Sequence, residues 1–174
     1  VINALDTPDI IAVGTCGLVT ALHGDGFGVI WQYDMATFEP SSAAIGDINN
    51  DGQPDVVTTG SNGFFALRGD TGELMWSNPF TPLAETAICG GVSIYDLDGD
   101  GTVEVVQGAT IVNGADGSLR GQGVHGRGSG YPGGTFAGFG VAADINQDGQ
   151  VTAADDALVT STDDFGFNEG FEFL

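Results

Sequence analysis

The sequence predicts an all-β protein built from repeated four-stranded units, about three and a half of them. Three observations point to this class. An acidic loop of one design recurs along the chain, short apolar strands follow each copy at a period of 46 to 49 residues, and thirty glycines serve the turns. Helical periodicity is confined to one short stretch near residues 152–159.

The loop is most complete at residues 47–55. Its candidate ligands are oxygen donors at the spacing of a calcium loop: Asp47, Asn49, Asp51, Gln53 through its carbonyl, and Asp55. Gly52 permits the sharp turn that this spacing requires. Two carboxylates held about 4 Å apart repel by roughly 4 kcal/mol at an effective dielectric constant near 20. We therefore expect a bound cation to stabilise the loop.

Two further copies of the loop follow. The second begins 49 residues later and offers Asp96, Asp98, Asp100, Thr102 through its carbonyl, and Glu104. The third offers Asp144, Asn146, Asp148, Gln150 through its carbonyl, and Asp155. The start of the chain aligns with the first loop, but Leu5 replaces the central acid there. The sequence thus predicts two to three Ca²⁺ ions as the only cofactor.

Each repeat is expected to run strand, calcium loop, strand, glycine-rich turn, strand, Asp-Gly turn, strand. The second repeat has strands near residues 42–46, 56–59, 64–67 and 73–76, and the third near 92–95, 104–106, 109–112 and 118–119. The first repeat lacks its leading strand and uses 9–13, 18–22 and 29–31. Trp76 lies 45 residues after Trp31, which supports the alignment.

Four-stranded sheets repeated every 40 to 50 residues are typical of propeller blades. We treat residues 1–174 as one repeat domain with approximate repeats 1–40, 41–88, 89–137 and 138–174, the last being atypical. Because propellers usually close with four to eight blades, the chain is expected to need the rest of a larger propeller, or other copies of itself, to complete its sheets.

The loop pattern followed by the stretch FFALRGDTGELMW, and the Phe-Gly pair before the third loop, resemble the FG-GAP/VCBS calcium-binding repeats of integrin-α-like β-propellers. The resemblance covers the chain to about residue 150. It implies calcium held in the loop between the first two strands of a blade, on an extracellular or cell-surface protein.

The third loop departs from this pattern because Thr152, not an acid, stands at position 9. Closure by Asp155 at position 12 resembles half of a dockerin or an EF-hand, in which a helix follows the loop. Thr152 could cap a helix over residues 152–159, and the sequence favours helix over strand there.

Composition excludes some partners. Three Lys plus Arg against 24 Asp plus Glu make nucleic acid an unsuitable ligand. No apolar run reaches the roughly 18 residues needed to span a bilayer. Calcium loops favour a secreted or surface location, where calcium is millimolar. Cys16 and Cys89 are expected to be two buried free thiols, although a disulfide could persist there.

No catalytic motif is present, so we expect no enzyme and no catalytic residues. His23 aligns with Arg68 and is predicted to be a turn residue, while His125 lies in the long irregular loop 121–134. The function indicated is a structural or adhesive repeat protein, with a glycan or protein as ligand. The alternatives are an accessory propeller segment of a secreted polysaccharide-degrading enzyme and a dockerin-like docking module.

The C-terminal residues 165–174 alternate aromatic and polar side chains with a period of two, as a half-buried strand does. They contain no lysine or proline to protect a strand edge. If residues 1–174 form the whole subunit, we expect this segment to pair with a neighbouring copy and form a ring or a filament.

Overall fold

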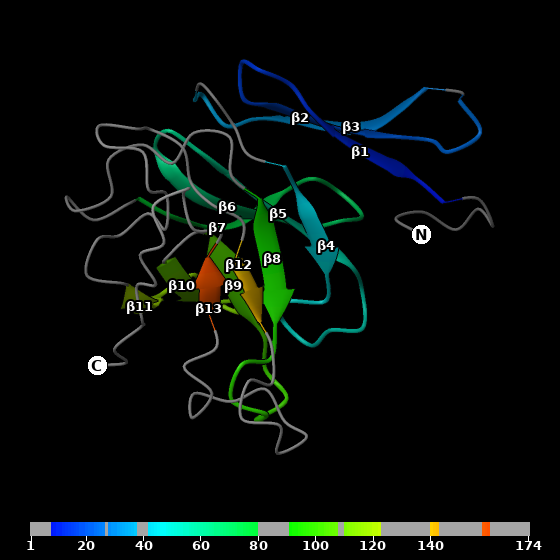
Figure 1. The fold of residues 1–174 in the computed structure, drawn as a ribbon. Coiled ribbons are helices and arrows are strands. Elements are labelled where there is room, and N and C mark those ends of the chain that lie inside the picture. The colour runs from blue at the N-terminus through cyan, green and yellow to red at the C-terminus, as the bar shows by residue number, and fades with distance from the viewer. Residues whose placement is uncertain are drawn as a thin grey trace.

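Strands and turns make up the computed structural model of the chain, which describes residues 8–26, 28–37, 42–79, 91–107, 110–122, 140–142 and 158–160. These residues form three antiparallel sheets and one shorter strand pair (Figure 1). No helix lies among them, and therefore none that is long and apolar enough to cross a membrane. The all-β prediction is confirmed.

Each sheet is a meander in which successive strands pair. The first contains β1 (Ile10–Val13), β2 (Leu18–Leu22) and β3 (Val29–Asp34). The second contains β4 (Ala44–Gly46), β5 (Asp55–Gly60), β6 (Gly63–Leu67) and β7 (Leu74–Asn78). The third contains β8 (Val92–Tyr95), β9 (Glu104–Gln107), β10 (Thr110–Asn113) and β11 (Leu119–Gln122). The second and third sheets have the predicted order of strands, loops and turns.

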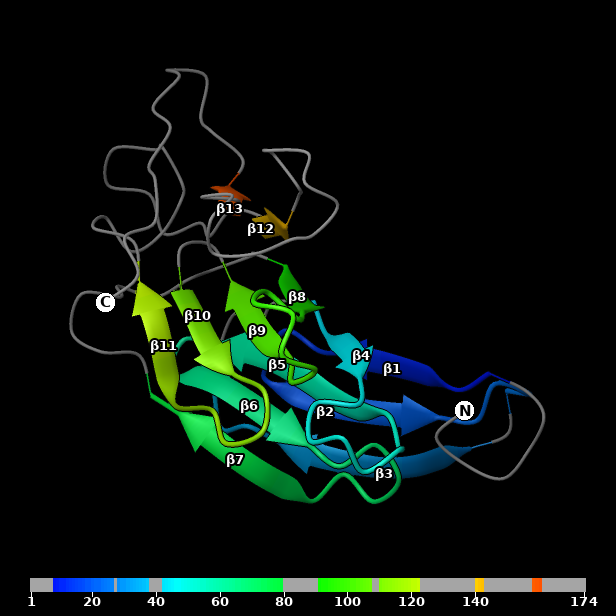
Figure 2. The ribbon, with the colours of Figure 1, turned by 90° about the horizontal axis from the view of Figure 1, so that it is seen from below.

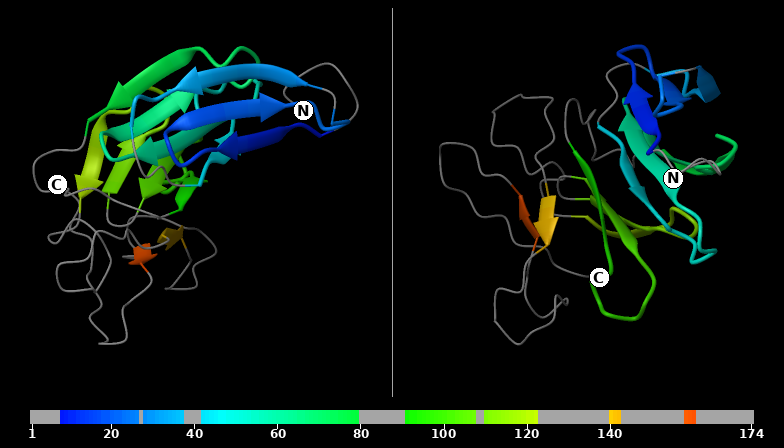
Figure 3. Two further views of the ribbon diagram at one scale, coloured as in Figure 1. Left: turned by 90° about the horizontal axis from the view of Figure 1, so that it is seen from above. Right: turned by 90° about the vertical axis from the view of Figure 1, so that its right-hand side faces the viewer.

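Neighbouring sheets pack face to face, as the left panel of Figure 3 shows. In the middle sheet, successive side chains along a strand point alternately to the first sheet and to the third sheet. Val56, Phe65 and Leu67 join the core with the first sheet, whereas Val57, Phe64 and Ala66 join the core with the third sheet. Because both faces are covered, every residue of β5 and β6 is buried. This two-sided burial explains their continuous apolar character.

The first strands of the four-stranded sheets lie side by side. Ser42, just before β4, forms a parallel bridge with Gly91, just before β8, and the two residues are 49 positions apart. β4 lies beside β8, and β8 lies beside β12 (Gly140–Ala142). Figure 2 shows β4 and β8 next to each other at the same edge of their sheets. This is the arrangement of inner strands in propeller blades, although the described sheets do not close into a ring.

β12 pairs with β13 (Leu158–Thr160). The helix expected over 152–159 is therefore wrong for residues 158 and 159, which are extended. The remainder of that stretch lies outside the described residues, as do the third loop and the segment 165–174. Cys16 is exposed and unbonded in the turn between β1 and β2, which corrects the expectation of a buried thiol, and Cys89 lies outside the described residues.

Candidate metal centre

The two described acidic loops are folded by the same hydrogen bonds. In residues 47–55, the Asp47 carboxylate accepts the backbone N–H of Asp51 at 3.0 Å and that of Gly52 at 2.8 Å. Asn49 Oδ1 also accepts the Asp51 N–H, and Asp51 Oδ1 accepts the Gln53 N–H. Each polar side chain thereby turns the backbone two to five residues further on.

The loop at residues 96–104 repeats all four bonds 49 residues later. Asp96 accepts the N–H groups of Asp100 and Gly101, Asp98 accepts that of Asp100, and Asp100 accepts that of Thr102. The loops also touch each other, since Asn50 Nδ2 donates to the Gly101 carbonyl at 2.9 Å. The shared spacing of the acids in the sequence thus corresponds to the same backbone conformation in both loops.

The last acid of each loop is buried, unlike the acids before it. Asp55 begins β5 and Glu104 begins β9, and each is 1% exposed. Burial is the main cause that raises the pKa of both carboxyl groups. Each accepts one equivalent backbone N–H, from Ile48 and from Leu97 respectively, which opposes the rise. Each loop therefore directs one poorly hydrated carboxylate toward its own acidic side chains.

The two buried carboxylates differ in their remaining partners. Asp55 accepts a second backbone N–H, from Gly69, but its Oδ2 is fully buried and has no hydrogen-bond partner, and the charges of Asp51 and Asp47 raise the Asp55 pKa further. Glu104 instead accepts a hydrogen bond from Arg120, whose other terminal nitrogen donates to Asp98. Buried polar groups almost always have a partner. The orphaned oxygen of Asp55 marks a position where a cation would fit.

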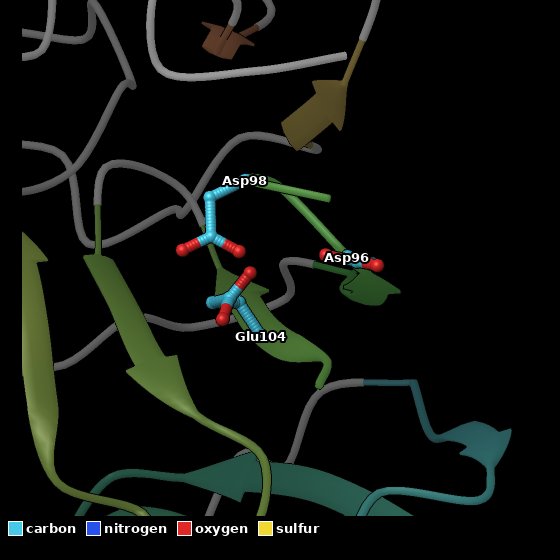
Figure 4. A group of neighbouring side chains, drawn as sticks. All are labelled: Asp96, Asp98 and Glu104. Atoms are coloured by element: carbon cyan, nitrogen blue, oxygen red, sulfur yellow. The ribbon is translucent and has the colours of Figure 1, made fainter. Parts of the chain in front are cut away.

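Three acidic side chains meet in the second loop. Oxygens of Asp96, Asp98 and Glu104 lie within 4.8 Å of one another, the one such group of three acidic, histidine or cysteine side chains in the part of the chain that the structure describes. Figure 4 shows the Asp98 and Glu104 carboxylates facing each other across the loop. An all-oxygen set of this kind suits a hard divalent cation such as Ca²⁺.

The remaining predicted ligands that the structure describes hold the backbone of their own loops. Asp47, Asn49 and Asp51 fold their own loop, and Asp100 does the same in the second, where its pKa is lowered chiefly by the Thr102 hydroxyl. Asp144, Asn146, Asp148, Gln150 and Asp155 lie outside the described residues. The sequence reading missed Arg120, because it reaches the loop from β11 and belongs to no motif.

The tryptophans are packing residues. Trp31 Nε1 donates to the Gly69 carbonyl at 2.7 Å, and Trp76 Nε1 donates to the Gly114 carbonyl at 2.8 Å, each across 38 residues. Each indole thus joins the last strand of one sheet to the Asp-Gly turn of the next. These contacts hold both indoles in the interfaces between sheets.

The family of FG-GAP-like repeats matches residues 47–106, about a third of the chain, which includes both described loops. Among solved structures, the chain resembles the crystal structure of BamB from Moraxella catarrhalis, a β-propeller-type protein, with a TM-score of 0.50 and 20% identity. The likeness covers 80% of this chain and 37% of that one, so the chain corresponds to well under two thirds of its length. No curated protein sequence matches. Residues 47–106 thus resemble FG-GAP-like repeats, and the described sheets have a propeller-type arrangement.

Proposed function

We propose that the chain is a calcium-stabilised propeller repeat domain with a structural or adhesive role outside the cell. The observation that carries the calcium assignment is the buried, unpartnered Oδ2 of Asp55 at the end of an all-oxygen loop. An isolated buried carboxylate is costly, and a divalent cation offsets that cost while neutralising the acids beside it. Support for an extracellular location comes from the match to FG-GAP-like repeats and from the millimolar calcium found there.

In loop 47–55, Asp47, Asn49, Asp51 and Asp55 would hold the ion together with the Gln53 carbonyl. In loop 96–104, the corresponding residues are Asp96, Asp98, Asp100 and Glu104 with the Thr102 carbonyl. Bound calcium would supply positive charge that holds each loop against the start of β5 or β9. The role that we propose for the ions is structural.

Calcium removal tests this proposal. If a loop binds calcium with a dissociation constant near 10 μM, about 1 mM calcium should stabilise the fold by roughly 2.7 kcal/mol for each independent site. Thermal unfolding with calcium or chelator, and native mass spectrometry for the ion count, measure the two quantities. An unchanged unfolding midpoint in chelator would exclude the proposal.

Single substitutions assign the ions to the loops. Asp51→Ala and Asp100→Ala each remove a central carboxylate and should each lose one ion. Asp25→Ala is the matched control, because Asp25 is an exposed acid in the turn between β2 and β3 and outside both loops. Equal ion loss in all three variants would contradict the assignment.

The partner we propose is a further blade. Ile10, Leu18 and Val29 are 53%, 39% and 51% exposed, and the strand register places them on the face of the first sheet that points away from the second. Ile10 stands 46 residues before Val56, which is buried between the first and second sheets. The same position is thus covered in the second sheet and uncovered in the first. Another blade packed as in the two observed interfaces would cover it.

A further inference from the structure

The arginine in the second loop points to a difference between the two calcium loops. Arg120 Nη1 donates to Glu104 Oε1, and Nη2 donates to Asp98 Oδ2. The guanidinium fork thereby spans two of the three carboxylates grouped in that loop. Bidentate or bridging arginine contacts of this kind are among the strongest hydrogen bonds in proteins.

All four carboxylate oxygens of Asp98 and Glu104 already accept a hydrogen bond. Glu104 Oε2 accepts the Leu97 N–H at 2.8 Å and Asp98 Oδ1 accepts the Asp100 N–H, so Arg120 uses the remaining oxygen of each group. A calcium ion coordinated by both Asp98 and Glu104 would compete with the guanidinium for the same pair of carboxylates. Because both are cations, they exclude each other from this position.

Arg120 lies at a β-bulge. β10 and β11 pair Ile111 with Gly121 and Val112 with Leu119, which leaves Arg120 as the extra residue of a bulge. The same irregularity recurs 45 and 90 residues earlier, where the extra residues are Met75 and Ile30. A bulge redirects the side chain of its extra residue.

The three bulge residues have different environments. Ile30 and Met75 pack against the apolar cores between sheets. Arg120 instead turns its charge into the acidic loop of its own sheet and is 25% exposed. In the loop of the second sheet, Arg68 forms an ion pair with the exposed Asp51 at 3.9 Å, and among the described residues the buried Asp55 has no ion pair of its own. Among the three sheets that the structure describes, only the third therefore has an arginine at this bulge.

We propose that Arg120 is an internal cation for loop 96–104, which holds this loop closed without calcium and which calcium must displace. The inference rests on the proposed function, since it assumes that both loops can take calcium. It follows that loop 47–55 binds calcium first and depends on it for order. Loop 96–104 stays ordered in its absence and fills only at a higher concentration.

Arg120→Met tests the inference, because methionine is the residue at the equivalent bulge of the second sheet. Isothermal titration calorimetry with calcium is carried out on the full chain carrying Asp51→Ala, which removes calcium binding at loop 47–55. Arg120→Met should tighten binding at loop 96–104 by at least tenfold, and Arg120→Lys, which keeps one positive charge, should tighten it less. Arg68→Met in an Asp100→Ala background is the matched control and should change binding at loop 47–55 by less than about threefold.

Thermal unfolding gives the second readout. In chelator, Arg120→Met should lower the unfolding midpoint, because the buried Glu104 loses its counter-charge, and saturating calcium should restore it. A merely structural arginine would lower the midpoint equally with and without calcium. If Arg120→Met does not fold in chelator, the Arg120→Lys titration provides the comparison.

The outcomes separate this inference from the proposed function. Calcium binding that is unchanged or weaker in Arg120→Met overturns the inference about Arg120 but does not contradict the proposed calcium-stabilised domain. Tighter binding in Arg120→Met, with no binding at loop 47–55 in any variant, supports the role of Arg120 but removes the proposed site at Asp55. Absence of binding at both loops in every variant overturns both proposals.

Discussion

At the scale of single residues, Asp55 and Glu104 have one structural role and opposite electrostatic surroundings. Both are buried at the first residue of a strand, and burial raises the pKa of both. Glu104 has Arg120 as its counter-charge, whereas Asp55 has an oxygen without a partner and two acids nearby. Replacing the carboxylate by an amide should therefore change the free energy of unfolding in opposite directions at Asp55 and at Glu104.

In chelator, Asp55→Asn should leave the free energy of unfolding unchanged or raise it by about 1 kcal/mol, because an uncompensated buried charge is removed. Glu104→Gln should lower it by roughly 2 kcal/mol, because a charged hydrogen bond to Arg120 is lost. In millimolar calcium, Asp55→Asn should instead become destabilising, since it no longer holds an ion. Urea unfolding under both conditions measures the signs, and equal losses for the two variants in chelator would contradict the argument.

These residues also show how far sequence alone could reach. The alternating acids and the glycine after them predict the loop and its turn, because local hydrogen bonds that Asp47 and Asp96 accept from backbone N–H groups decide its shape. The alignment of His23 with Arg68 correctly predicts a turn residue. The contact of Arg120 could not be predicted, because it depends on a bulge that aims one side chain across 16 residues. Calcium ligation itself stays a prediction.

At the scale of elements, one turn joins each sheet to the sheet before it. This is the Asp-Gly turn before the last strand of each four-stranded sheet. The three-stranded first sheet has an equivalent turn before β3. His23, Arg68 and Asn113 each donate a backbone N–H to the carbonyl five residues later, at 45-residue intervals. Trp31 packs on the second of these turns and Trp76 on the third. A Cβ added at Gly117 would lie 2.3 Å from a Trp76 ring carbon, and Gly117 has a φ of 70°.

Gly117→Ala should therefore lower the free energy of unfolding by at least about 3 kcal/mol, since it combines a left-handed backbone with a clash against a ring held by its own hydrogen bond. Gly26→Ala is the control, because Gly26 has a φ of 83° and nothing within 4 Å of an added Cβ. Its cost should be about 1 to 2 kcal/mol. Chemical denaturation of the two variants compares them, and equal costs would show that the indole moves aside freely.

The element order was predictable because turn residues and strand residues alternate strictly in the sequence. The helix expected over 152–159 rested on local helical periodicity, a possible Thr152 cap and the resemblance of the third loop to an EF-hand. Pairing of β13 with β12 supplies backbone hydrogen bonds that override this local preference at residues 158–160.

At the scale of the whole molecule, the sheets form a stack with one covered middle and one uncovered end. The middle sheet buries both faces, while the first sheet leaves Ile10, Leu18 and Val29 exposed on its outer face. The strand β1 is also an edge strand, because no strand pairs with its far side among the described residues. An exposed apolar face beside an open edge invites another sheet.

If the further blade comes from a second copy, the chain should associate as its concentration rises, and Ile10→Glu should prevent this while changing the free energy of unfolding of the monomer by less than about 0.5 kcal/mol. Ile45→Glu is the matched control, since Ile45 is 52% exposed, close to the 53% of Ile10, but lies on the inner strand β4 and not on the outer face. Sedimentation velocity over a range of concentrations compares the three proteins. Loss of association in Ile10→Glu alone would place the contact on the outer face of the first sheet, and equal loss in both variants would place it elsewhere. A wild-type chain that stays monomeric at every concentration would exclude a second copy, and the covering blade would then have to come from another part of a longer propeller.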